Sequence, residues 1–362
     1  MASLFELYES FGQSPWIDNL QRSWLTEGTL AQLIRSGVRG VTSNPSIFAH
    51  AISTGSDYAE HLGDLKGASV DDIYWDLVLH DISGACKVLR PLYDASHGRD
   101  GFVSVEVDPR LAHNKTATVE SAIKIKERVG APNLLVKIPA TEEGVAAVKE
   151  VVSQGVSVNV TLIFSRVRYK AVMEAYIAGL EAYMHDHDDN PGQLASVASF
   201  FVSRTDVKVD SLLTNRAYQG ELYGKAAVAL AKLAYQDFLE VFSSDRWNLL
   251  AERGAQVQRP LWASTSTKNP HYADLLYVDN LIGPNTVNTM PEATLHAFQD
   301  HGQPRVSLLE DLEASKASLQ DLIKHGVDLD QVALELEDEG VEAFENSHLE
   351  ILQLLEKKLS EL

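Results

Sequence analysis

Short apolar runs recur along the chain, and each is followed by a segment whose apolar residues have helical spacing. The run LLVKIPAT over residues 134–141 is typical, because Leu, Val and Ile crowd a few positions before Thr141 opens a helix-start pattern. Runs of this length and composition predict buried parallel strands. We expect eight of them, over residues 15–18, 40–44, 102–108, 134–141, 156–164, 195–202, 260–264 and 286–290.

The segments between these runs are predicted helices. The helix predicted from Ser69 to Tyr93 opens with a Ser-x-x-Asp cap and keeps its apolar residues on one face. One long helical stretch is expected from Ser203 to about Phe242, and the segment from Ser243 to Gln258 is expected to be irregular. Further helices are expected over residues 26–36, 115–128, 142–153 and 165–184, from near residue 46, after Pro291, and through the acidic segment 306–362.

This alternation of strands and helices favours one closed barrel. No Asn-Gly or Asp-Gly hairpin turn joins two of the strands, so parallel strands with right-handed crossovers are expected, and eight of them close into a (β/α)8 TIM barrel. A doubly wound sheet usually carries a glycine fingerprint after its first strand, and neither GxGxxG nor GxxxxGK[ST] occurs. We therefore predict a single α/β barrel domain over residues 1–362, with residues 303–362 as a helical extension packed on it.

Composition narrows the classes of partner. The 51 acidic and 31 basic residues give a formal net charge of -20, which disfavours nucleic acid and anionic membranes as partners. An anionic substrate would need cations gathered in its own pocket. Cys86 is the single cysteine, which excludes an intramolecular disulfide and a Cys-rich metal site. Together with the lack of a signal-peptide pattern and of an apolar run near ~20 residues, this predicts a cytoplasmic protein.

One polar segment offers metal-ligand types. His185 to Asp189 contains two histidines among aspartates, which is a combination that binds metals in some proteins. The segment is bounded by Pro and Gly, so a solvated connection is the favoured interpretation. We predict no metal site there.

Lys137 is the most informative residue. Strand alternation places it on the same face as Leu135 and Pro139, inside the barrel, where an ammonium group is costly unless it is used. One interpretation is a lysine that reaches a rim or pairs with an interior carboxylate. The other is an amine whose pKa burial lowers from ~10.4 toward ~7 to 8, so that it can attack a carbonyl.

The other polar candidates stand at or near the C-terminal ends of separate predicted strands. In a barrel these ends meet at one mouth, where such enzymes place their chemistry, and this convergence favours the catalytic interpretation. Structural roles stay open for single residues: Asp18 or Glu106 could form a salt bridge with Lys137, and buried amides and hydroxyls often serve only backbone groups. The set is Asp18, Asn44, Glu106, Lys137, Asn159, Thr161, Ser199, Arg204 and Lys268.

Five short motifs, in order along the chain, resemble those of transaldolases, and most closely those of the longer bacterial branch. They are Gly40-Val41-Thr42-Ser43-Asn44-Pro45-Ser46, Val105-Glu106-Val107-Asp108, Val136-Lys137-Ile138-Pro139, Asn159-Val160-Thr161-Leu162-Ile163-Phe164-Ser165 and Ser199-Phe200-Phe201-Val202-Ser203-Arg204. The resemblance runs from about Ser14 to Pro291. Each motif alone is weak evidence for the family, but the occurrence of all five in this order is specific to it.

The resemblance implies transfer of a dihydroxyacetone unit between sugar phosphates in the non-oxidative pentose phosphate pathway, without metal or organic cofactor. Lys137 matches the Schiff-base lysine of the family. Asp18 matches its acid/base carboxylate, and Glu106 with Thr161 matches the pair that moves protons through a bound water. Asn44, Asn159 and Ser199 match groups that bind substrate hydroxyls, and Arg204 matches a phosphate-binding arginine.

Two departures from the family pattern stand out. The second phosphate-binding position of the family is commonly arginine, and the corresponding residue here is Lys268, although the alignment passes through a segment with extra residues. A lysine cannot form the two parallel hydrogen bonds that an arginine guanidinium forms with phosphate. The Lys137 motif also ends in Ile-Pro-Ala-Thr, which should change packing more than mechanism.

Two competing functions stay open. One is an aldolase of the same fold that releases its product, although such proteins lack the counterpart of Glu106. The other is a barrel that binds sugar phosphates without catalysis. Phosphorylated sugars are the expected partners in each case, and the protein could be a monomer or a homodimer.

Overall fold

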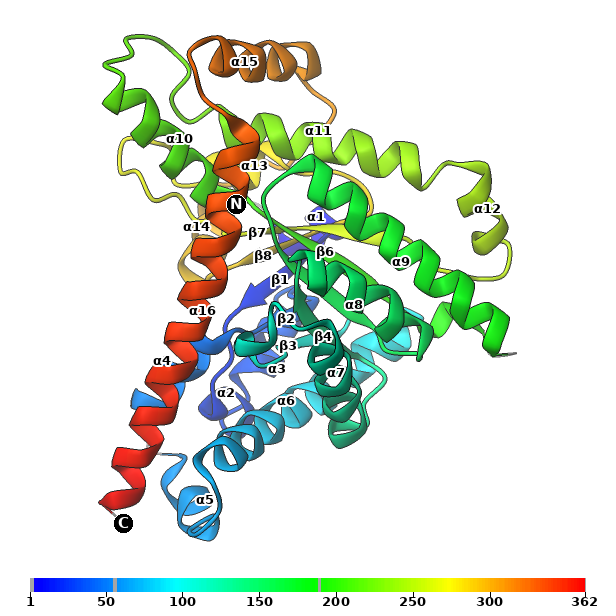
Figure 1. The fold of residues 1–362 in the computed structure, drawn as a ribbon, viewed down its shortest axis with the longest axis vertical. Coiled ribbons are helices and arrows are strands. Elements are labelled where there is room, and N and C mark those ends of the chain that lie inside the picture. The colour runs from blue at the N-terminus through cyan, green and yellow to red at the C-terminus, as the bar shows by residue number, and fades with distance from the viewer. Residues whose placement is uncertain (1–2, 55–56, 188–189, 362) are drawn as a thin grey trace.

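Eight parallel strands close into a barrel in the computed structural model, which describes residues 3–54, 57–187 and 190–361 (Figure 1). Each strand pairs with the next along the chain, and the last pairs with the first. This confirms the predicted (β/α)8 TIM barrel. The strands are β1 Gln13–Asp18, β2 Gly40–Thr42, β3 Phe102–Glu106, β4 Leu134–Pro139, β5 Val158–Ile163, β6 Ser196–Phe201, β7 Gln258–Ala263 and β8 Thr286–Met290.

Helices follow the strands and cover the outside of the barrel. Several begin at caps that the sequence predicts: the Ser69 hydroxyl accepts from the Asp72 N–H, and the Thr141 hydroxyl accepts from the Gly144 N–H. Between β1 and β6 the helical elements are α2 Arg22–Thr26, α3 Thr29–Arg35, α4 Pro45–Thr54, α5 Ala59–Asp64, α6 Val70–Ala95, η1 Pro109–Leu111, α7 Lys115–Val129, α8 Glu142–Ser153, α9 Arg166–Asp186 and η2 Pro191–Gln193, and α1 Leu4–Glu9 precedes β1. After β6 come α10 Ser203–Asn215, α11 Ala226–Val241, α12 Asp245–Ala251, α13 Leu276–Asn280, α14 Glu292–His301, α15 Leu312–Lys324 and α16 Leu329–Ser360.

The helical prediction between Ser203 and Gln258 was wrong in two places. The single long helix is two helices, α10 and α11, because Ala217 and Gly224 between them have left-handed φ angles of 53° and 67°. The segment expected to be irregular contains α12, whose cap is the Ser244 hydroxyl accepting from the N–H of Trp247. Burial of that tryptophan in the core stabilises this short helix.

Strand register fixes which interior side chains are neighbours. Lys137 of β4 is the register partner of Glu106 on β3 and of Asn159 on β5. The β5–β6 register shifts between Val160 and Ile163, and Leu162 has a φ angle of 60° at this irregularity. Lysine, glutamate and asparagine therefore occupy one layer of the barrel.

The C-terminal segment ends in the long helix α16, which runs past α10 and alongside α4 (Figure 1). Gly340 lets it approach the barrel closely, because a Cβ atom there would lie 2.9 Å from the Leu162 side chain. The division into a barrel and an extension from residue 303 stays a prediction. No helix within the described residues is both long enough and apolar enough to cross a membrane.

Candidate active site

The Lys137 amine lies inside the barrel against a carboxylate from the next strand. Its side chain is buried, and Nζ donates to the backbone carbonyl of Ser43 at 2.9 Å. Nζ also lies 3.1 Å from Oε2 of Glu106 in an ion pair. Register pairing of β3 with β4 sets this contact, so the fold itself brings the amine and the acid together.

Glu106 has an unusual environment for a carboxylate. Burial raises its pKa, while the positive charge of Lys137 acts in the opposite direction. Its Oε1 and the Thr161 hydroxyl are buried and have no hydrogen-bond partner among the described residues. Buried polar groups normally have partners, so these two atoms have hydrogen-bonding capacity that the described residues leave unused.

Asp18 is the second carboxylate of the site and ends β1. Burial raises its pKa, and the hydrogen bond from Thr42 and the charges of Lys137 and Lys268 oppose that rise. The Thr42 hydroxyl donates to Oδ1 of Asp18 at 2.6 Å and lies 2.6 Å from the Thr289 hydroxyl. A carboxyl group with raised proton affinity, held by hydroxyls near an amine, suits acid/base chemistry.

A cavity of about 130 Å³ lies above the amine at the mouth of the barrel. Seven of the nine residues predicted from the sequence line it, namely Asp18, Asn44, Lys137, Thr161, Ser199, Arg204 and Lys268. Glu106 and Asn159 are not among the lining residues and contact those that are. The structure thus brings seven of the predicted residues to one cavity, and Glu106 and Asn159 lie behind its wall.

Two amides have partners within the protein. The amide nitrogen of Asn159 donates to the Ser104 hydroxyl at 3.1 Å, and its oxygen accepts from the Ser199 hydroxyl at 2.7 Å. The Asn44 oxygen accepts from the Ile47 N–H at 3.0 Å, at the start of α4. These bonds hold Ser199 and Asn44 in fixed orientations at the cavity wall.

Two cations stand at the mouth of the cavity. Arg204, the second residue of α10, lies 5.3 Å from the centre of the Phe201 ring, and burial lowers its pKa. In the described part of the chain neither Arg204 nor Lys268 forms an ion pair with a carboxylate. The Lys268 ammonium is exposed and donates to the Ser266 hydroxyl at 2.7 Å. Both charges are thus available to an anionic group, beside the N–H groups that begin α10.

Among the cavity residues that sequence reasoning missed, three bear on the chemistry: Thr42, Thr289 and Phe344. Thr42 and Thr289 form the hydroxyl chain that reaches Asp18, and their positions at the C-terminal ends of β2 and β8 were the signal that could have found them. Phe344 also lines the cavity, although it belongs to α16. No local pattern in an acidic amphipathic helix identifies such a residue.

In the polar segment that begins at His185, neither His185 nor His187 lines the cavity. Nδ1 of His185 is 2.7 Å from a carboxylate oxygen of Asp186, and the His187 ring stacks on Tyr183 with centroids 4.7 Å apart. Asp188 and Asp189 lie outside the described residues. The two histidines therefore have separate contacts.

Known proteins match almost the whole chain. A family model described as transaldolase/fructose-6-phosphate aldolase matches residues 15–355. A transaldolase of Saccharopolyspora erythraea is 50% identical over 99% of this chain and 98% of its own length. A transaldolase of Thiobacillus denitrificans is 48% identical over 94% of this chain and 96% of its own length. A transaldolase of Mycolicibacterium smegmatis is also 48% identical, over 96% of this chain and 95% of its own length.

These matches agree with the geometry at the mouth of the barrel. They confirm the resemblance drawn from the five motifs, and with it the expectation of a transferase with transaldolase function. The chain belongs to the transaldolase/fructose-6-phosphate aldolase family.

Proposed function

We propose that this protein transfers a dihydroxyacetone unit between sugar phosphates through a Schiff base on Lys137. The observation that carries the proposal is the amine itself, buried in the barrel, 3.1 Å from Glu106 and open to a cavity that Asp18 also lines. The donor would be sedoheptulose 7-phosphate and the acceptor glyceraldehyde 3-phosphate, giving erythrose 4-phosphate and fructose 6-phosphate. We place this reaction in the non-oxidative pentose phosphate pathway of the cytoplasm.

The lysine nitrogen attacks the ketose carbonyl carbon. Loss of water from the carbinolamine gives a protonated imine, which withdraws electrons so that the adjacent carbon–carbon bond breaks to an enamine. Asp18 removes the hydroxyl proton as that bond breaks and returns a proton when the new bond forms. Its raised pKa makes it a better base than an ordinary aspartate.

Glu106 and Thr161 serve the formation and hydrolysis of the imine. Glu106 lies at ion-pair distance from the amine, so it is placed to take the proton that the amine must lose before it attacks. The Thr161 hydroxyl has its hydrogen-bonding capacity free among the described residues. Together they would move protons through a water molecule during loss and addition of water.

The remaining predicted residues would hold the substrate. Arg204 and Lys268 are the cations at the mouth and would bind the phosphate group, Arg204 with two parallel hydrogen bonds and Lys268 as a point charge. Asn44 and Ser199 would hold hydroxyl groups of the three-carbon unit, with Asn159 supporting Ser199 from below. These two cations would offset the negative charge of the phosphate group in a protein whose net charge is -20.

Trapping the imine tests the proposal. Reduction with borohydride in the presence of fructose 6-phosphate should attach a three-carbon adduct to Lys137, found by peptide mass spectrometry, and Lys137→Ala should abolish both adduct and turnover. Lys232→Ala is a matched control, because Lys232 is also buried and donates to the Glu310 carbonyl, outside the cavity. Absence of an adduct on wild-type Lys137 would favour a barrel that binds sugar phosphates without catalysis.

A second assay separates transfer from simple cleavage. Erythrose 4-phosphate added with fructose 6-phosphate should give sedoheptulose 7-phosphate. An enzyme that forms the adduct and yields only free dihydroxyacetone and glyceraldehyde 3-phosphate would instead be an aldolase. Neutral sugars and nucleic acids should not compete with the phosphorylated sugars for binding. Measurement of the molecular mass in solution would distinguish a monomer from a homodimer.

A further inference from the structure

One face of α16 meets the mouth of the barrel. Gly340, Phe344 and His348 are spaced four residues apart, so they lie in a row on the same side of the helix. Gly340 touches the Leu162 side chain at the end of β5, Phe344 lines the cavity, and His348 faces Asp108 beyond β3. The helix thus passes over the strand ends that carry the candidate chemistry.

Phe344 is the member of this row nearest to the amine. Its side chain is 4% exposed, and its ring centroid lies 5.6 Å from Nζ of Lys137. At this distance the ring covers the nitrogen from the side of the helix. Because an imine would form on this nitrogen, the same ring would lie beside the lysine-bound unit.

Polar contacts hold α16 in place before Phe344. Lys208 of α10 forms ion pairs with Glu335 at 2.8 Å and Glu339 at 2.6 Å. Arg168 of α9 pairs with the largely buried Glu337 at 3.0 Å. Three carboxylates of the helix are therefore bound to the barrel's outer helices within two turns.

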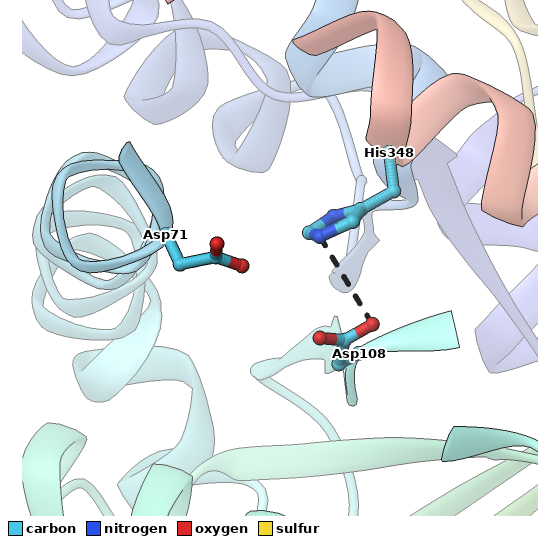
Figure 2. A group of neighbouring side chains, drawn as sticks. All are labelled: Asp71, Asp108 and His348. Carbon is cyan, nitrogen blue, oxygen red and sulfur yellow. Dashed lines mark ion pairs between the residues drawn. The ribbon is translucent and has the colours of Figure 1, made fainter. Parts of the chain in front are cut away.

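A second group of contacts holds α16 after Phe344. Figure 2 shows the buried His348 ring directed at Asp108, 4.0 Å away, with Asp71 of α6 opposite. Although the three side chains are close enough to share a cation, the Arg110 guanidinium already binds both carboxylates. The His348 ring also packs edge-on against Tyr74. We therefore infer that His348, Asp108 and Asp71 hold α16 in place.

The cavity under Phe344 is small for its proposed substrates. It encloses about 130 Å³, whereas small-molecule sites usually enclose about 300–1,000 Å³. The phenyl ring therefore leaves little room for bulk water around Nζ. A lysine-bound unit of three carbons needs less room than a whole sugar phosphate.

We propose that Phe344 determines the fate of the lysine-bound enamine, by keeping bulk water from it until an aldehyde acceptor arrives. The inference rests on the proposed function. In transfer, the enamine carbon attacks the acceptor carbonyl carbon, Asp18 gives a proton to the acceptor oxygen, and water then releases the product from the lysine. In release, Asp18 passes its proton through a water molecule to the enamine carbon, a water molecule then adds to the imine carbon, the carbon–nitrogen bond breaks, and free dihydroxyacetone leaves. A drier cavity disfavours the second route.

The test compares the ratio of the two products among four proteins. Wild type, Phe344→Leu, Phe344→Ala and Ile351→Ala are each given fructose 6-phosphate with erythrose 4-phosphate, and free dihydroxyacetone and sedoheptulose 7-phosphate are measured. Ile351 is buried on α16 but does not line the cavity, so its truncation controls for loss of packing. Purely structural damage lowers both products together and leaves their ratio unchanged.

Phe344→Ala should raise the ratio of release to transfer about tenfold or more, with a smaller rise for Phe344→Leu and none for Ile351→Ala. A wild-type ratio in Phe344→Ala would overturn the inference, and if that variant does not fold, a wild-type ratio in Phe344→Leu has the same force. Failure of the proposed function looks different, because wild type itself would then form no sedoheptulose 7-phosphate, either without an adduct on Lys137 or with an adduct that yields only free dihydroxyacetone.

Discussion

The buried pair of Lys137 and Glu106 joins structure and chemistry at the level of single residues. Removing an ammonium and a carboxylate from water is costly, and the pair is tolerated because Lys137 has a second partner in the Ser43 carbonyl. The burial that makes the pair costly also raises the pKa of the Glu106 carboxyl. Glu106 is thereby a suitable acceptor for the proton that a nucleophilic amine must lose.

Glu106→Gln should slow formation of the reducible adduct by about 10²–10⁴-fold at saturating fructose 6-phosphate, because an amide neither accepts nor returns that proton. Rapid-quench borohydride trapping measures the rate. Glu337→Gln is the matched control, since Glu337 is also a largely buried glutamate paired with a cation, but does not line the cavity. Equal rates in Glu106→Gln and wild type would remove Glu106 from proton transfer.

Arg204→Ala should raise KM for fructose 6-phosphate by about 10–100-fold and leave KM for unphosphorylated fructose nearly unchanged, because a charged hydrogen bond to phosphate is lost. Lys268→Ala should have a smaller effect, since the exposed ammonium is screened by solvent. Arg216→Ala, which removes an exposed arginine at the far end of α10, controls for net charge. An unchanged KM for the phosphorylated sugar in Arg204→Ala would exclude this arginine from the phosphate site.

Among the elements, α16 was the one whose role the sequence left open. Its acidic, amphipathic pattern predicted a helix but not the surface on which it packs, because ridge-into-groove contacts depend on shape. Gly340 allows α16 to pack against β5, since it leaves room for the buried Leu162 side chain. The helix approaches β5 where the strand register is irregular.

Gly340→Val should lower stability by about 1–3 kcal/mol, because its side chain overlaps Leu162 and forces α16 away from the barrel. Ala343→Val introduces the same β-branched residue at an exposed position of the same helix and measures the cost of a helical valine that overlaps no buried neighbour. Urea unfolding followed by circular dichroism gives both values. Equal losses in the two variants would show that the contact at Gly340 is not tight.

At the scale of the whole molecule, Asp206 joins three helices around the site. Its carboxylate accepts from the N–H of Ala227 at 2.8 Å, at the start of α11, and from the hydroxyl of Tyr277 in α13 at 3.0 Å. Asp206 itself lies in the first turns of α10, two residues after Arg204. Burial raises its pKa to about 7, and these hydrogen bonds act in the opposite direction.

This raised pKa predicts a pH dependence of folding stability. The protonated carboxyl stabilises the fold fully below pH 3.8, the pKa of an unburied aspartate, and that contribution is lost as the pH rises to about 7. The free energy of unfolding of Asp206→Asn minus that of wild type should therefore increase from pH 4 to pH 7 and then stay constant. Urea unfolding across this range measures it, with the exposed Asp64→Asn as control. A difference independent of pH would contradict the prediction.

The sequence predicted more of the barrel than of its covering. Each strand is a short buried run that can be recognised from its own residues. Any closed parallel barrel brings the polar residues at its strand ends together. Asp18, Lys137 and Arg204 could therefore be predicted to lie at one mouth from the sequence. The break between α10 and α11 depends on left-handed backbone at Ala217, which that residue type does not indicate. Phe344 reaches the cavity only through packing of α16, and no short-range pattern encodes that.

A consequence for enzyme engineering follows from the way Phe344 reaches the cavity. The helix that carries it supplies part of the cavity wall, while every candidate reacting group comes from the barrel and the loops at its rim. Exchanging this helix between relatives would therefore change the cavity wall while leaving every candidate reacting group in place. Changes in which sugars are accepted are therefore expected from substitutions around Phe344 in α16, where laboratory evolution can begin.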